Sequence, residues 1–132
     1  MLTLKDVATY IVTLSVVPED HIYCGKLDSK KPKSIGVYNL RRNGVPIKAI
    51  GPSSYRIKSV SLLVHWSKNS EETELAADLL YQKLESVRNV TINNKKIYYI
   101  SLRVSEPVDV GTDDAGVYEM VIEADIYYER EE

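Results

Sequence analysis

The apolar and polar residues alternate most regularly near the C-terminal end of the chain, over residues 117–129. Acidic residues occupy most positions of one parity there. Because successive side chains of a strand point to opposite faces, this alternation predicts a long strand with one face buried. At roughly 3.3 Å per residue it would span about 40 Å, more than a small globule needs, which suggests packing against copies of itself. The residues of the buried parity are Tyr118, Met120, Ile122, Ala124, Ile126 and Tyr128.

Other stretches have a similar alternation. Residues 57–66 and 95–104 predict two more long strands, the second joined in a hairpin to residues 90–92. Shorter strands are expected at 21–27 and 35–40. The residues expected to face inward are Val60, Leu62, Val64 and Trp66 in the first long strand, and Tyr98, Ile100, Leu102 and Val104 in the second.

Turn residues separate these strands. Asn43-Gly44 is a strong hairpin signal, and a strand returning from it would cover 45–50, where Pro46 restricts it to an edge or a first position. Residues 107–116 are rich in Asp and Gly, which favour turns. We therefore expect a turn-rich segment directly before the C-terminal strand.

Two stretches have helical spacing instead. Thr3 can cap a first helix that begins at Leu4, and Pro18 ends it. Asn69 or Ser70 can cap a second helix, whose first turn is acidic, as the helix macrodipole favours. The apolar stripe expected on this second helix consists of Leu75, Ala76, Leu79, Leu80, Leu84 and Val87.

These elements predict an α+β fold: a single domain over residues 1–132, with a mostly antiparallel twisted sheet that carries two main helices, most simply on one face. Apolar residues make up 44% of the chain and charged residues 27%, as in globular proteins. No apolar run reaches the ~18 residues of a membrane span, and the N-terminal stretch lacks the pattern of a signal peptide. We therefore expect no membrane partner.

Charge is distributed unevenly along the chain. Residues 1–60 carry ten Lys or Arg and four Asp or Glu, a balance of +6, whereas residues 61–132 carry seven and fifteen, a balance of −8. Oppositely charged halves suit head-to-tail contact between identical subunits. Alternatively, the two halves fold side by side and neutralise each other within one subunit.

The candidate metal ligands and nucleophiles form no recognisable site. His21, His65 and Cys24 are not spaced as ligands, and structural zinc usually takes four N or S ligands. Cys24 has no cysteine partner in the chain, so no intrachain disulfide forms and the cytoplasm is the expected place of synthesis. We expect Cys24 to be a small core residue and His65 to be exposed or half-buried, with a subunit contact as the alternative for His65.

The aspartates at 109, 113 and 114 do not have the alternate spacing of a calcium-binding loop, so we expect them to cap a turn. The sequence also lacks the nucleophile elbow of hydrolases and the glycine-rich loops that bind nucleotides. It therefore predicts neither catalytic residues nor a cofactor.

Basic residues gather in segments 28–34 and 41–48. They could contact phosphate, but dedicated nucleic-acid domains are usually basic overall and this chain has a pI of about 5.7. Solvated loops and a contact with another protein are the better interpretations. From charge and expected exposure, the predicted interface residues are Lys30, Lys31, Lys33, Arg41, Arg42, Lys48, Asp113 and Asp114.

Several motifs, taken in order and spacing, resemble a known family. Over residues 4–130 the chain resembles the phage minor capsid family, which groups with the tail terminator (tail completion, head–tail joining) proteins of long-tailed bacteriophages. The motifs are Leu63-Val-His-Trp-Ser-Lys68, Thr73-Glu74, Leu80-Tyr-Gln-Lys-Leu84, Pro107-Val-Asp-Val-Gly111, Asp114-Ala-Gly-Val-Tyr-Glu119 and Ile126-Tyr-Tyr-Glu-Arg130.

The resemblance implies a non-enzymatic structural protein of the virion. Such proteins form a ring, typically a hexamer, on the head-proximal end of the tail tube, end tube polymerisation and dock to the head. The implied partners are copies of itself, the major tail tube protein and a head-completion or connector protein, while genomic DNA passes through the ring without specific recognition. The implied location is the head–tail interface, after assembly in the host cytoplasm. Two alternatives stay open: an adaptor module that binds a peptide on a sheet edge, and a minor capsid or head-completion component.

Overall fold

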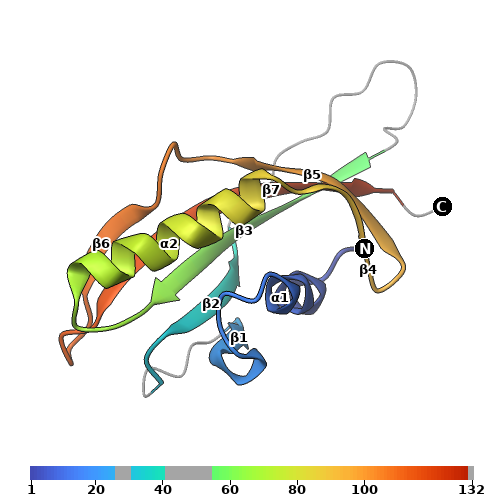
Figure 1. Ribbon diagram of the computed structural model, residues 1–132. Helices are drawn as coiled ribbons and strands as arrows, with labels where there is room; N and C mark the ends of the chain where they lie inside the picture. Colours follow the sequence, from blue (N-terminus) through green and yellow to red (C-terminus); the bar gives the residue numbers. More distant parts are fainter. Residues whose placement is uncertain (26–30, 41–54, 131–132) are drawn as a thin grey trace.

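The protein is built on one sheet with two helices packed on the same face (Figure 1). The computed structural model describes residues 1–25, 31–40 and 55–130. The predicted Asn43-Gly44 hairpin and its returning strand at 45–50 lie outside these residues. The helices are α1 (Leu4–Thr13) and α2 (Ser70–Glu85), and a 3-10 turn, η1, covers Glu19–His21. The strands are β1 (Ile22–Cys24), β2 (Ser34–Asn39), β3 (Tyr55–His65), β4 (Arg88–Ile92), β5 (Lys95–Leu102), β6 (Val108–Thr112) and β7 (Tyr118–Glu129).

The sheet is mostly antiparallel, as the sequence predicts. Its strand order is β1-β2-β3-β7-β5-β4, and among the described strands only β1 and β2 run parallel. β3 pairs with β7 along its whole length, from Tyr55 opposite Glu129 to His65 opposite Glu119. On its other side, β7 pairs with β5 near its C-terminal end and with β6 near its N-terminal end. β7 is therefore the central strand, and the α+β class is confirmed.

The predicted alternation of β3 and β7 is confirmed by their burial. Val60 lies opposite Ala124, and Leu62 lies opposite Ile122, and all four side chains are almost completely buried. These side chains meet α1 and α2, so both helices cover the same face of the sheet. α2 lies along the length of β3 and β7 (Figure 1). Neither helix of the described residues has the length and hydrophobicity required to cross a membrane.

Both helices begin at the predicted caps. The Thr3 hydroxyl accepts a hydrogen bond from the backbone N–H of Asp6, whose carboxylate accepts one from the backbone N–H of Thr3, which completes a capping box. In α2 the side-chain oxygen of Asn69 accepts a hydrogen bond from the N–H of Glu72. The cap of α2 is thus Asn69 rather than Ser70.

The apolar stripe predicted for α2 is only partly correct. Ala76, Leu80, Leu84 and the following Val87 are buried, as expected. Leu75 and Leu79 are instead 65% and 46% exposed. The residues that face the sheet repeat every three or four positions, and this phase excludes both leucines. They are Thr73, Ala76, Ala77, Leu80, Tyr81 and Leu84.

Two features near β7 also differ from the prediction. The pairing of β5 with β7 shifts register between Ile97 and Tyr99, so Ile97 and Ile100 reach the core while Tyr98 is only half-buried. The extra residue of this bulge breaks the expected alternation. The segment expected to be turn-rich contains β6, which pairs with β7 and has its own register shift before Gly111, a residue with a φ of +92°.

Cys24 lies in a different environment from the one expected. β1 is a three-residue strand that pairs only with β2 in the described part of the chain. Cys24 ends this edge strand and its side chain is exposed, so its prediction as a core residue is wrong. The composition of the run 21–27 predicts a strand but does not reveal that the strand lies at the edge of the sheet.

Candidate assembly interface

The predicted basic interface residues are partly neutralised within the subunit. Nζ of Lys31 lies 3.6 Å from Oδ2 of Asp20, and Nζ of Lys33 lies 3.3 Å from Oε1 of Glu72. The second contact joins the basic part of the chain to the acidic part, in line with local neutralisation. The two lysine side chains remain 41% and 57% exposed, so a partner can still reach them. Lys30, Arg41, Arg42 and Lys48 lie outside the described residues.

Asp113 and Asp114 occupy one turn but have different environments. Oδ1 of Asp113 accepts hydrogen bonds from the backbone N–H groups of Ala115 and Val117, both at 2.9 Å. The hydrogen bond from Val117 is the main reason that the pKa of Asp113 is lowered, and those from neighbouring backbone groups contribute in the same direction. The predicted capping role is confirmed for Asp113. Asp114 is exposed.

His65 is almost completely buried, with 1% exposure, so the expectation of an exposed or half-buried side chain is wrong. It ends β3 between Ser34 of β2 and Glu119 of β7, which enclose it. Nδ1 of His65 lies 3.0 Å from Oε2 of Glu119, and its Nε2 lies 3.7 Å from Oδ2 of Asp113. This cluster fixes the turn before β7 against the end of the sheet. Among the described residues, no three His, Cys, Asp or Glu side chains are placed to bind a metal ion.

The face of the sheet opposite the helices carries aromatic and polar side chains. The ring of Tyr127 stacks on those of Tyr55 and Tyr99, with centroid separations of 5.6 Å and 4.4 Å. Farther along β7, Oδ1 of Asp125 accepts hydrogen bonds from the Ser59 hydroxyl and from Nε of Arg103. The residues of β3 and β7 that face away from the helices therefore form a second, polar layer outside the core.

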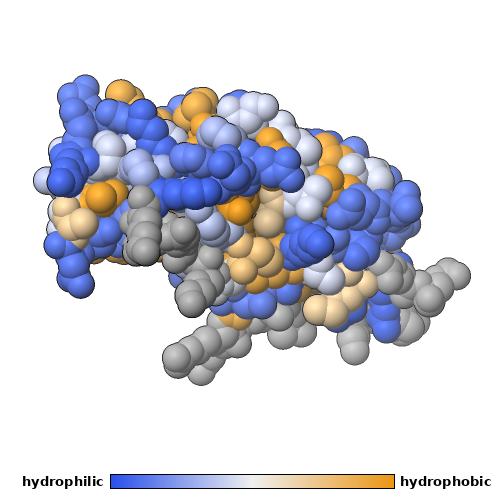
Figure 2. All heavy atoms as spheres, turned by 90° about the horizontal axis from the view of Figure 1, so that it is seen from below, coloured by the Kyte–Doolittle hydropathy of each residue, from blue (hydrophilic) through white to orange (hydrophobic). Residues whose placement is uncertain are grey.

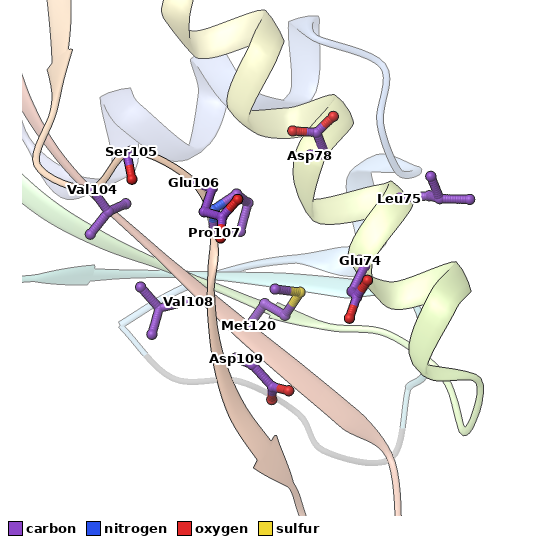
Figure 3. Close-up of a pocket in the computed structure, with 10 residues that line it drawn as sticks. All are labelled: Glu74, Leu75, Asp78, Val104, Ser105, Glu106, Pro107, Val108, Asp109 and Met120. Atoms are coloured by element: carbon purple, nitrogen blue, oxygen red, sulfur yellow. The ribbon is translucent and has the colours of Figure 1, made fainter.

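A groove lies between α2 and β6, and Figure 3 shows the side chains around it. It has a volume of about 780 Å³. In the close-up, Glu74 from α2 and Asp109 from β6 lie on either side of Met120, which belongs to β7. None of the carboxylates that line the groove forms an ion pair with a Lys or Arg among the described residues. These carboxylates are Glu74, Asp78, Glu106 and Asp109.

Two exposed apolar side chains, those of Leu75 and Val108, line the same groove. In the view from below, hydrophobic residues come to the surface in small groups among hydrophilic ones (Figure 2). Leu75 and Leu79 on α2 and Val108 and Val110 on β6 account for four of the six large hydrophobic residues that stay exposed in the described part of the chain. The sequence prediction missed this surface because it assigned both leucines to the core and no strand to 108–112.

A known family matches nearly the whole chain. The model of the family "Bacteriophage tail terminator protein" matches residues 2–130. No individually curated protein matches the chain at a significant level. The family is structural and non-enzymatic, and its members are components of the phage tail, which agrees with the absence of catalytic motifs in the sequence. Because the match covers nearly the whole chain, the chain belongs to the bacteriophage tail terminator protein family.

Proposed function

We propose that this protein forms a hexameric ring on the head-proximal end of the phage tail tube. The ring ends polymerisation of the tube and provides the surface to which the head docks. The observation that carries this proposal is the family match over residues 2–130. The proposed partners are further copies of the chain, the major tail tube protein and a head-completion or connector protein. Genomic DNA passes through the ring without specific recognition.

The physical properties of the subunit support self-association. The two longest strands of the described residues, β3 and β7, pair along the whole of β3 and form the centre of the sheet. The chain has a basic N-terminal part and an acidic C-terminal part. An interface between two different surfaces of identical subunits closes into a ring when a whole number of equal rotations between neighbours completes one full turn.

We propose that the ring and docking contacts involve the predicted charged residues. Lys31 and Lys33 support this, since both stay exposed despite their contacts within the subunit. Asp114 supports it as an exposed carboxylate beside the turn that precedes β7. The remaining residues of the proposed set are Lys30, Arg41, Arg42, Lys48 and Asp113.

Deleting the gene from the phage tests the proposed function. Without a terminator, tube polymerisation continues, so electron microscopy should show overlong tails and free heads. Expression of the wild-type protein from a plasmid should restore tails of uniform length, and averaged end-on views of these tail ends should show six-fold symmetry. Tails of normal length in the deletion mutant would refute the termination role.

Charge reversal tests the docking residues. Replacement of Lys30, Lys31, Arg41 and Arg42 by Glu should abolish joining of tails to heads and leave the fold intact, as measured by circular dichroism. Lys5→Glu is a matched control, because Lys5 is exposed on α1 and lies outside the proposed set. Normal infectious particles from the quadruple variant would contradict the assignment.

A further inference from the structure

We propose that the groove between α2 and β6 receives the basic segment 41–48 of the neighbouring subunit. The inference rests on the ring proposed above and adds the acceptor surface and its occupant. The groove presents four carboxylates, those of Glu74, Asp78, Glu106 and Asp109, to one hollow of about 780 Å³. No Lys or Arg of the described residues pairs with any of them, so none of the described basic side chains compensates their charge.

The borders of the groove are suited to a protein partner. Leu75 on the helix side and Val108 on the strand side line the groove and are 65% and 44% exposed. Leu79, four residues further along α2, and Val110, two residues further along β6, are 46% and 51% exposed. Exposed apolar side chains next to a rim of polar groups mark protein contact sites more often than solvated surface. A small ion would compensate the carboxylates but would leave these apolar side chains in water.

β6, whose residues Val108 and Asp109 line the groove, also has an edge without a strand partner among the described residues. In the described part of the chain it pairs with β7 and with no other strand, and all its residues are exposed. The outer edge of such a strand can add a further segment of chain through backbone hydrogen bonds. The groove therefore combines a negative rim, apolar borders and an open strand edge.

The segment 41–48 of a second copy has the complementary composition. It carries Arg41, Arg42 and Lys48 together with Val45 and Ile47, and it contains no acidic residue. Its three positive charges meet the four negative charges of the groove, and its apolar residues match the exposed borders.

Two further basic residues of the proposed interface, Lys31 and Lys33, have partners within their own subunit. Lys31 and Lys33 contact Asp20 and Glu72 within their subunit, which favours 41–48 as the occupant. The donor segment and the acceptor groove are different parts of one chain. The contact therefore repeats head to tail from subunit to subunit, as a closed ring requires.

A charge-swap experiment in the complete phage tests the inference. Variants expressed from a plasmid complement the deletion mutant, and the infectious titre and the tail length are measured. Glu74→Lys combined with Glu106→Lys should weaken subunit association on the order of 100-fold, as expected for reversed charges at an interface, and complementation should be lost. Arg41→Glu combined with Arg42→Glu should have the same effect. All four substitutions in one chain should restore complementation, because every subunit then carries both reversed surfaces.

Controls separate this inference from the proposed function. Glu85→Lys lies on the exposed side of α2 away from the groove and should complement fully. Circular dichroism and thermal unfolding of each purified variant show whether it folds. If the groove variant folds and complements like the wild type, or if the four-fold variant fails to recover, the groove inference is wrong. Overlong tails in the deletion mutant would still support the terminator function in either case.

Discussion

Oδ2 of Asp6, in α1, lies 2.5 Å from Nζ of Lys95, at the start of β5 and 89 residues later in the chain. The other oxygen of this carboxylate accepts a hydrogen bond from Nδ2 of Asn93 at 2.9 Å. The same carboxylate closes the capping box at Thr3. One buried side chain thus caps the first helix and also attaches it to the β4–β5 hairpin.

Asp6→Asn should destabilise the fold by about 2 kcal/mol, because an amide keeps one acceptor oxygen but loses the charge that Lys95 requires. Urea unfolding of the purified protein measures the change. Asp20→Asn is the control: the Asp20 side chain is 71% exposed, and its contact with Lys31 should contribute less than ~1 kcal/mol. Equal unfolding midpoints for the wild type and Asp6→Asn would contradict the structural role of this carboxylate.

The same residue gives a pH dependence with a defined sign. Burial raises the pKa of Asp6, but hydrogen bonds from Lys95, Thr3 and Asn93 outweigh it and hold the pKa well below the ordinary value. A carboxyl whose pKa is lowered on folding contributes stability above its unfolded pKa of about 3.9. This contribution should be lost as the pH falls below about 4. The stability of Asp6→Asn should fall less steeply than that of the wild type over that range. If the two curves of stability against pH run parallel, Asp6 does not contribute this pH dependence.

The buried contact between His65 and Glu119 should be energetically coupled. His65→Leu removes the ring nitrogen that contacts the Glu119 carboxylate and should cost about 2 kcal/mol. Glu119→Gln tests the other side, and the double variant completes a cycle. A coupling free energy above about 0.5 kcal/mol is expected for side chains in direct contact. Additive effects would show that the two residues act independently.

The turn between β4 and β5 can be improved. Asn93 and Asn94 both have positive φ, 50° and 63°, which glycine adopts at lower cost than any other residue. Asn94→Gly should therefore raise stability by roughly 0.5 kcal/mol, as measured by the unfolding midpoint. Asn94→Val at the same position should lower it, because a β-branched side chain is strained there. The opposite order would argue against this turn geometry.

The two sets of leucines on α2 should respond differently to substitution. Leu80→Ala removes a side chain with 0% exposure and should cost roughly 2–5 kcal/mol. Leu75→Gln and Leu79→Gln change exposed side chains and should stay within about 0.5 kcal/mol of the wild type. Thermal unfolding of the three variants distinguishes them. A large loss of stability in Leu79→Gln would show that Leu79 packs in the core, as the apolar stripe in the sequence predicted.

The sequence predicts the centre of the fold well because the local pattern and the tertiary environment agree there. In β3 and β7 one face is buried and the other is polar, so the two-residue period appears directly in the sequence. For α2 the sequence contains two overlapping sets of apolar residues. Packing on the sheet selects the set that includes Ala77 and Tyr81, which the leucine pattern alone does not indicate.

The missed features depend on contacts between distant residues. His65 is buried because Glu119, 54 residues later, lies beside it, and its own neighbours in the sequence carry no sign of this. The residues of β6, Val108–Thr112, include Asp and Gly, which are disfavoured in strands, and pairing with β7 overrides that preference. The groove lies between α2, whose buried face the sequence predicted only in part, and β6, which it did not predict as a strand. The sequence therefore could not reveal the groove.

The exposed thiol of Cys24, in the only cysteine of the chain, offers a single position for attaching a fluorescent dye. A maleimide dye would label each subunit once, without any substitution. The number of photobleaching steps at one tail end would then count the subunits there, particle by particle.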